Sequence, residues 1–117
     1  MALSFNECVS ILKESLSRDE LDKGVAYAAE TAIPGGVQLQ FPRILMEVPS
    51  PAYLAFVDRE PQANWGHRCR YVLISRDTGK ITSQEARFPP FETGKDLHWR
   101  VVYRANGVDD SAVFTGR

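Results

Sequence analysis

The residues best suited to chemistry lie close together in the stretch ANWGHRCRY, in the middle of the chain. This stretch contains an indole (Trp65), an imidazole (His67), a thiol (Cys69) and two guanidinium groups (Arg68 and Arg70). An imidazole and a thiol can bind a metal ion or form a nucleophilic pair. Aromatic and guanidinium groups are instead typical of binding hot spots. The stretch therefore admits three hypotheses: a metal site, a thiol enzyme or a binding surface.

A metal site would be short of ligands. His67 and Cys69 are two positions apart, so on a strand both side chains would lie on the same face. Structural zinc usually has four ligands, and the other histidine and cysteine of the chain are His98 and Cys8. Cys8 falls on the apolar side of an expected helix, where a buried thiol is the usual outcome. We therefore predict no metal site and no cofactor.

A nucleophilic pair would join Cys69 to His67 or His98. A reactive cysteine needs a cation or an imidazolium close to its sulfur. Arg68 and Arg70 flank Cys69, but adjacent residues of a strand point to opposite faces, so both guanidinium groups should point away from the thiol. A small thiol- or metal-dependent enzyme that uses Cys69 with His67 or His98 is therefore the alternative function.

We expect the chain to recognise a protein or peptide, without catalysis. Aromatic and arginine side chains near strand ends would fill a groove of the partner, or an exposed edge strand would pair with a partner strand. The predicted binding residues are Trp65, His67, Arg68, Arg70, Trp99 and Arg100. The partner can equally be a second copy of the chain. A structural role is the competing interpretation, in which Trp65 covers one end of the core and His67 bonds a backbone carbonyl.

Composition narrows the class of protein. The chain has 117 residues, 44% of them hydrophobic and 25% charged, which suits a single domain, 1–117. Its 14 basic and 15 acidic residues give a formal net charge of −1, so no overall field attracts nucleic acid. We find neither a signal peptide nor an apolar stretch long enough to span a bilayer. We expect a cytoplasmic protein with free thiols and with neither nucleic acid nor membrane as a partner.

Two helices are predicted at the start of the chain. Ser4 and Glu7 have the spacing of a capping box, and the apolar residues after them recur at three- and four-residue steps. Those residues are Phe5, Cys8, Val9, Leu12 and Leu16. Ser17 and Glu20 repeat the capping signal, and the apolar positions that follow extend the second predicted helix over 18–32.

Strands follow the helices. Alternating apolar residues or a fully apolar run mark most of the predicted strands. They are 37–41, 44–48, 53–57, 71–75, 81–87 and 97–104. Gly79 can supply the positive φ of a tight turn, and Val113 and Phe114 are expected to pair back briefly. Helices first and strands after predict an α+β domain, with one or two N-terminal helices packed on one face of a four- to five-stranded antiparallel sheet.

Part of this strand pattern resembles a known family. The runs YLAFV at 53–57 and YVLISRDTGKI at 71–81 are similar to the strand, turn and strand of PepSY-type domains, where an aromatic strand runs into a turn with Asp, Thr, Gly and Lys or Glu. The resemblance implies a helix packed on a small antiparallel sheet, and a role as a propeptide or inhibitory module of proteases. It covers about a third of the chain and assigns no functional residues.

Overall fold

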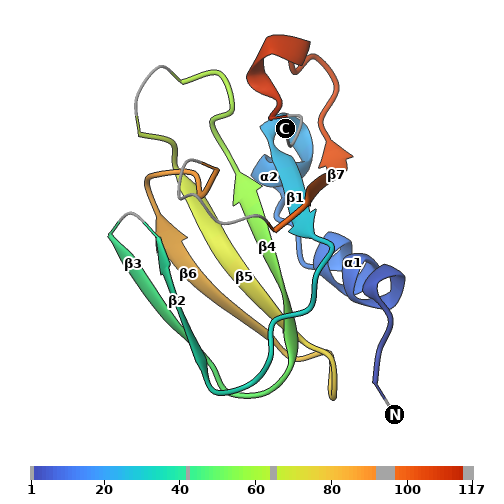
Figure 1. Cartoon of the computed structure of the whole chain (residues 1–117). Helices are drawn as coiled ribbons and strands as arrows, with labels where there is room; N and C mark the ends of the chain where they lie inside the picture. Colours follow the sequence, from blue (N-terminus) through green and yellow to red (C-terminus); the bar gives the residue numbers. More distant parts are fainter. Residues whose placement is uncertain (1, 42, 64–65, 92–96, 115–117) are drawn as a thin grey trace.

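The structure is a computed structural model of the chain, and it describes residues 2–41, 43–63, 66–91 and 97–114. Within these ranges the chain forms two α-helices, seven strands and one 3₁₀-helix, in the order α1, α2, β1 to β7 and η1 (Figure 1). The predicted α+β class with an antiparallel sheet is confirmed. Across the described ranges, no helix is both long and apolar enough to cross a membrane.

Both helices begin at capping boxes. α1 (Phe5–Glu14) is capped by Ser4, whose hydroxyl accepts from the Glu7 N–H at 3.1 Å, while the Glu7 carboxylate accepts from the Ser4 N–H at 2.8 Å. α2 (Arg18–Lys23) repeats this arrangement at its own N-terminus. Each box satisfies two backbone donors that a helix end otherwise leaves unpaired. The local sequence therefore fixes where each helix begins.

The second helix is shorter than predicted, and the extension to residue 32 was wrong. Gly24 follows α2 with extended backbone (φ −97°, ψ 173°), and a Cβ placed there would lie 2.8 Å from the carbonyl oxygens of Glu20 and Asp58. The next residues form β1 (Val25–Ala29), and all of them are buried. A short apolar run fits a fully buried strand as well as a helix, so packing between two neighbouring strands decides its conformation.

The main sheet has five antiparallel strands in the order β6-β5-β4-β1-β7 (Figure 1). β4 (Ala52–Asp58) and β5 (Cys69–Ser75) lie inside it, and nearly all of their residues are buried, as their apolar runs predict. β6 (Ile81–Ala86) and β7 (Trp99–Arg104) are the two edges. The sheet therefore offers two strands that another chain could reach.

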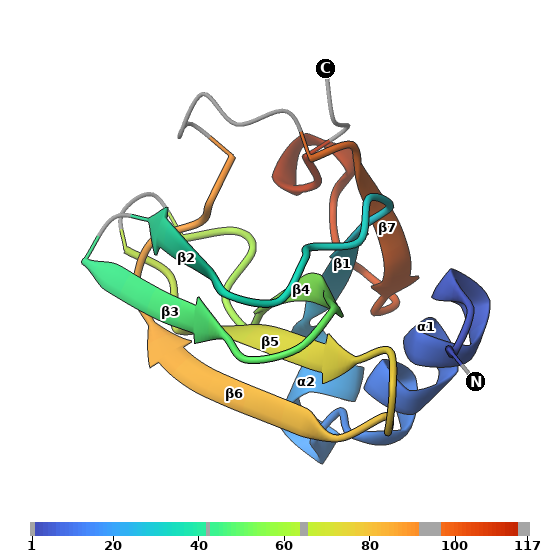
Figure 2. The same ribbon diagram turned by 60° about the horizontal axis from the view of Figure 1, so that its bottom comes forward.

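Different layers cover the two faces of the main sheet. On one face α1 packs its apolar stripe against β4 and β5. On the other face β2 (Val37–Phe41) and β3 (Ile44–Val48) form a separate two-stranded sheet that packs its apolar side on the core (Figure 2). Val113 and Phe114 were expected to pair as a strand, but they follow the 3₁₀-helix η1 (Asp110–Ala112) and pack against the same core. Both faces of the sheet are thus used by the fold.

Candidate functional site

The structure distributes the predicted binding residues over separate parts of the fold. Trp65 lies outside the described residues. The His67 side chain is 16% exposed, and its Nδ1 lies 2.7 Å from Oδ2 of the buried Asp58. Burial raises the pKa of Asp58, although the Glu60 N–H and the His67 imidazole oppose this shift. The His67 N–H also donates to the Arg87 carbonyl at 2.6 Å, so both the ring and the backbone of His67 are held by the fold.

Arg68 and Arg70 both point toward α2, on the face opposite the one that buries Cys69, as the alternation of a strand predicts. The Arg68 side chain is 51% exposed, and its Nε donates to Glu60 at 3.0 Å. The Arg70 side chain is only 9% exposed. Arg68 is therefore accessible to a partner, whereas Arg70 is enclosed by the protein.

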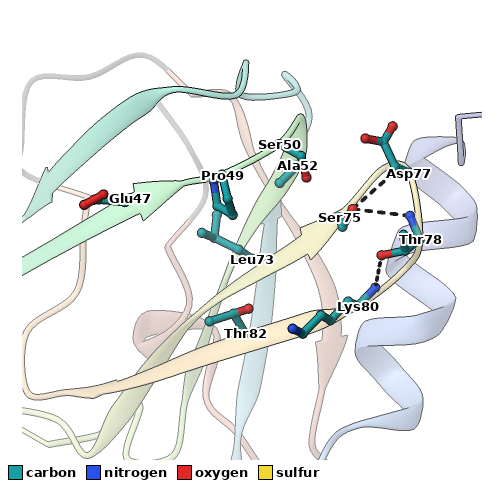
Figure 3. A pocket seen from close by; sticks show the side chains of 10 residues that line it. All are labelled: Glu47, Pro49, Ser50, Ala52, Leu73, Ser75, Asp77, Thr78, Lys80 and Thr82. Carbon is teal, nitrogen blue, oxygen red and sulfur yellow. Dashed lines mark hydrogen bonds between the residues drawn. The ribbon is translucent and has the colours of Figure 1, made fainter.

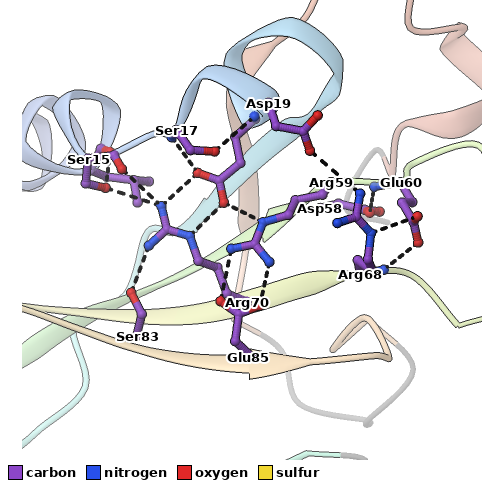
Figure 4. A network of polar contacts seen from close by, with 12 residues as sticks. Ser15, Ser17, Asp19, Asp58, Arg59, Glu60, Arg68, Arg70, Ser83 and Glu85 are labelled. Atoms are coloured by element: carbon purple, nitrogen blue, oxygen red, sulfur yellow. Dashed lines mark hydrogen bonds and ion pairs between the residues drawn. The ribbon is translucent and has the colours of Figure 1, made fainter.

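Arg70 belongs to a network centred on Glu20 of α2 (Figure 4). Its guanidinium donates to Glu20 Oε2 at 2.9 Å and to Glu20 Oε1 at 3.0 Å, and its Nη1 donates to Ser83 at 2.8 Å. Arg59 donates from Nε to Glu20 Oε2 at 2.8 Å, and from its Nη groups to both carboxylate oxygens of Glu85. Glu20 is 1% exposed. The buried Glu20 carboxylate thus links α2 to two arginines: Arg59, just after the end of β4, and Arg70, near the start of β5.

The network keeps Glu20 ionised inside the fold. Burial by itself raises the pKa of Glu20, but hydrogen bonds from Arg70, from the Ser17 N–H and from Arg59 outweigh it, so the pKa lies below the ordinary value of a glutamate. Removing one partner of such a buried pair leaves an uncompensated charge. We conclude that Arg70 stabilises the position of α2, because its guanidinium is enclosed and bonded within its own chain.

Trp99 and Arg100 lie on β7, at the opposite edge of the sheet from β6. The half-buried Trp99 ring packs edge-on against Phe91, with ring centroids 5.6 Å apart. Arg100 forms an ion pair with Glu30, and its guanidinium lies 5.1 Å from the ring centroid of Phe5 in α1. Both side chains therefore make contacts within their own chain.

The alternative function, a thiol-dependent enzyme, needs an activated cysteine, and neither Cys69 nor Cys8 has the environment of one. Cys69 is 0% exposed, and burial raises its pKa to about 12, with the Asp58 carboxylate adding to the shift. An activated thiolate needs a shift in the opposite direction. Cys8 is buried as well, and His98 is an exposed residue with a positive φ of 51°. Among the residues that the structure describes, no group of three or more His, Cys, Asp and Glu side chains could hold a metal ion.

The two edges of the main sheet differ in how they are protected. β7 carries a register shift opposite Ala26 and Tyr27, and such an irregularity hinders pairing with a further strand. β6 pairs with β5 without interruption and contains neither proline nor lysine. Residues 82–85 of β6 are all exposed. Native edges usually carry a bulge, a proline or a lysine. β6 has none of these and Glu85 is its one charged residue, so β6 is the less protected of the two edges.

The alternation of hydrogen bonds along the β5–β6 pair shows which backbone groups of β6 face outward. The Ser75 N–H donates to the Lys80 carbonyl at 3.0 Å, in the same register as the rest of the β5–β6 pair. In an antiparallel pair, alternate residues turn their N–H and C=O toward the partner strand. The even-numbered residues of β6 therefore face β5, and Ile81, Ser83 and Glu85 direct their backbone groups away from it. Figure 2 shows β6 as the outermost strand on that side of the sheet.

A groove of about 270 Å³ lies beside β6 (Figure 3). Pro49, Ala52 and Leu73 supply apolar lining, and Thr82 of β6 and Lys80 just before it supply polar lining. Side chains of a strand alternate between its two faces. Every second side chain of a strand added beside β6 would therefore lie on the side of this groove.

Sequence reasoning missed two parts of this site. A strand was predicted over 81–87 without an assignment to the edge of the sheet, and its lack of proline and lysine was the available sign of a weakly protected edge. Glu20 was identified only as a capping residue, and nothing local indicates that Arg70 reaches it. Comparisons with protein-family models, curated proteins and solved structures found no match to this chain. Function is therefore inferred from the geometry of the site.

Proposed function

We propose that this chain is a non-catalytic interaction module that binds an extended segment of a protein or peptide as an added strand beside β6. The observation that carries the proposal is the less protected edge of the sheet, where Ile81, Ser83 and Glu85 direct their N–H and C=O groups away from β5. Strand addition obtains affinity from main-chain hydrogen bonds and specificity from pockets for alternate side chains. The edge and the groove together offer both.

The groove gives the preferred side chain of the bound segment. An apolar side chain placed next to Thr82 would contact Leu73 and Pro49, which removes apolar surface from water. Lys80 and Asp77 also line the groove, so polar residues should flank that side chain. We therefore expect an extended ligand whose residue opposite Thr82 presents aliphatic carbons to the groove, either as an apolar side chain or as the methylene stem of a polar one.

Arg68 extends the proposed surface beyond the end of β6. A shallow depression there is lined by Arg59, Arg68, Glu85, Ala86 and Arg87. Among the predicted binding residues we retain Arg68 as a contact and assign Arg70 to the Glu20 network, while a contact through Trp65 stays a prediction. A PepSY-type inhibitory role would use such a surface as well, and it stays a prediction together with a cytoplasmic location.

Amide hydrogen exchange measured by NMR tests the proposal. Peptides are first selected from a displayed library for binding to the wild-type chain. We expect a bound peptide to slow exchange at Ile81, Ser83 and Glu85, because their N–H groups become bonded. Thr82 and Gln84 should change little, because their N–H groups already face β5. Peptides that protect neither Ile81 nor Glu85 would show that the site lies elsewhere.

A matched pair of variants locates the binding to this edge. Ser83→Pro removes the outward N–H, and Ser83→Ala is its control, because both variants lose the hydroxyl that accepts from Arg70. We expect Ser83→Pro to weaken peptide binding by about tenfold or more, which corresponds to about 1.4 kcal/mol. Equal affinity of both variants for the selected peptides would refute strand addition.

A further inference from the structure

We propose that the strand added beside β6 is β6 of a second copy of this chain, running antiparallel about a two-fold axis at Ser83. This inference rests on the proposed use of the β6 edge and names its occupant. Two identical antiparallel strands are self-complementary, because a two-fold axis repeats every contact. The pairing would join the two five-stranded sheets into one sheet of ten strands.

The outward groups of β6 select the position of the axis. With the axis at Ser83, Ile81 of each copy faces Glu85 of the other, so all three outward residues pair and make about six main-chain hydrogen bonds. With the axis at position 82, Glu85 would face Gly79, whose N–H already donates to Ser75. With the axis at position 84, Ile81 would face residue 87, whose carbonyl already accepts from the backbone of residue 67. Only the axis at Ser83 uses the whole edge.

The side chains on the groove side are compatible with this register. Thr82 of each copy faces Gln84 of the other, so the dimer contains two such pairs. In each pair the Thr82 hydroxyl can form a hydrogen bond with the Gln84 amide. Lys80 faces Ala86, so no cation meets another. Because Thr82 lines the groove, Gln84 of the second copy lies next to the groove. Both grooves fall on the same face of the joined sheet, since the axis is normal to it.

The opposite side of the joined strands carries no conflict of charge. Glu85 of each copy faces Ile81 of the other, and its carboxylate is already bonded to Arg59 of its own chain. Ser83 faces Ser83 across the axis. Like charges placed directly opposite would be destabilising, and this register contains none. Self-pairing therefore needs no change in the network that fixes α2.

Sedimentation measures the self-pairing. A strand pair alone buries less than a standard interface of about 1,600 Å², so we expect a weak dimer that dissociates on dilution. Wild-type chain and Ser83→Ala should dimerise between about 10 μM and 1 mM, while Ser83→Pro should remain monomeric. Exchange at Ile81 and Glu85 should slow as the wild-type concentration rises, with no peptide added.

Disulfide trapping tests the register without changing the backbone. Both native cysteines are buried, so an introduced surface cysteine is the accessible thiol. The proposed register places 82 of one copy and 84 of the other in a non-hydrogen-bonded pair, with Cα atoms about 4.5 Å apart, as a disulfide requires. A mixture of Thr82→Cys and Gln84→Cys should cross-link at least about fivefold faster than either variant alone. Cross-linking by one variant alone as fast as by the mixture would overturn the register.

The outcomes separate this inference from the proposed function. A wild-type chain that stays monomeric at about 1 mM overturns self-pairing. The proposed function survives that result if selected peptides still protect Ile81 and Glu85. A dimer that Ser83→Pro leaves intact uses another surface, and it also overturns the inference. If Ser83→Pro fails to fold, the cross-linking of the cysteine mixture decides between the same alternatives.

Discussion

Arg70→Met is the sharpest test of the buried network. The substitution keeps an unbranched side chain but removes the guanidinium that donates two of the four hydrogen bonds accepted by the Glu20 carboxylate. Glu20 is 1% exposed in the fold, so we expect it to stay buried in the variant. A charge that remains in the interior with fewer partners destabilises the folded state. The variant therefore asks whether Arg70 holds the fold together or faces a partner.

The expected loss follows from the contacts. Hydrogen bonds to charged groups contribute about 1.5–3 kcal/mol each, and breaking a buried ion pair costs about 3–5 kcal/mol. Arg59 still donates to Glu20, so we expect the free energy of unfolding to fall by about 3–4 kcal/mol. This loss is a large part of the free energy of unfolding of an ordinary domain, which is about 5–15 kcal/mol. Adding Glu20→Gln should recover part of the loss, because the unpaired charge disappears.

Urea denaturation followed by circular dichroism measures the effect. Arg68→Met is the matched control, since Arg68 points to the same face but is 51% exposed, and exposed ion pairs contribute little. The midpoint should shift strongly for Arg70→Met and hardly at all for Arg68→Met, with similar slopes. If the free energies of unfolding of Arg70→Met and Arg68→Met differ by less than about 1 kcal/mol, the Glu20 network does not hold the fold together as we infer.

The same variant should change the dependence of stability on pH. The folded-state pKa of Glu20 lies below its ordinary value of 4.5, because hydrogen bonds from Arg70 and its other donors outweigh the effect of burial. A lowered carboxyl pKa contributes stability above the unfolded-state pKa, and this contribution is lost as pH falls through the folded-state pKa. The difference between wild type and Arg70→Met should therefore be largest near neutral pH and shrink below about pH 4. A difference that stays constant from pH 7 to pH 3 would contradict this assignment.

Two further predictions concern thiols and turns. Cys8 and Cys69 should resist thiol labelling in the native chain at pH 8 and react when denaturant unfolds it, because both are buried and the pKa of Cys69 is raised to about 12; rapid native labelling of either thiol would contradict this. Gly79→Ala should lower the melting temperature more than Gly107→Ala. Both glycines have positive φ, but only at Gly79 would the new Cβ meet another atom, Cδ1 of Ile11 in α1 at 2.8 Å; the expected difference is about 1 kcal/mol. Equal shifts would contradict this prediction and mean that the end of the Ile11 side chain moves aside at little cost.

Local sequence signals were sufficient to predict several elements of the fold. The capping boxes at Ser4 and Ser17 mark where both helices begin, because each uses residues three positions apart. The apolar runs within β4 and β5 predict buried strands, and Gly79 predicts the positive φ of the turn before β6. These features depend on neighbours along the chain. The order of helices and strands along the chain was also sufficient to predict the α+β class.

The tertiary structure alone decided the rest. Val25–Ala29 has a composition that suits a helix, and it becomes β1 because β4 and β7 bond both of its edges. Arg70 and Glu20 are 50 positions apart, and no local pattern shows that the fold brings them together. The exposure of the β6 edge likewise depends on which strand ends the sheet. Such features arise from contacts between distant segments, and hydrophobic periodicity carries no information about which segments become neighbours.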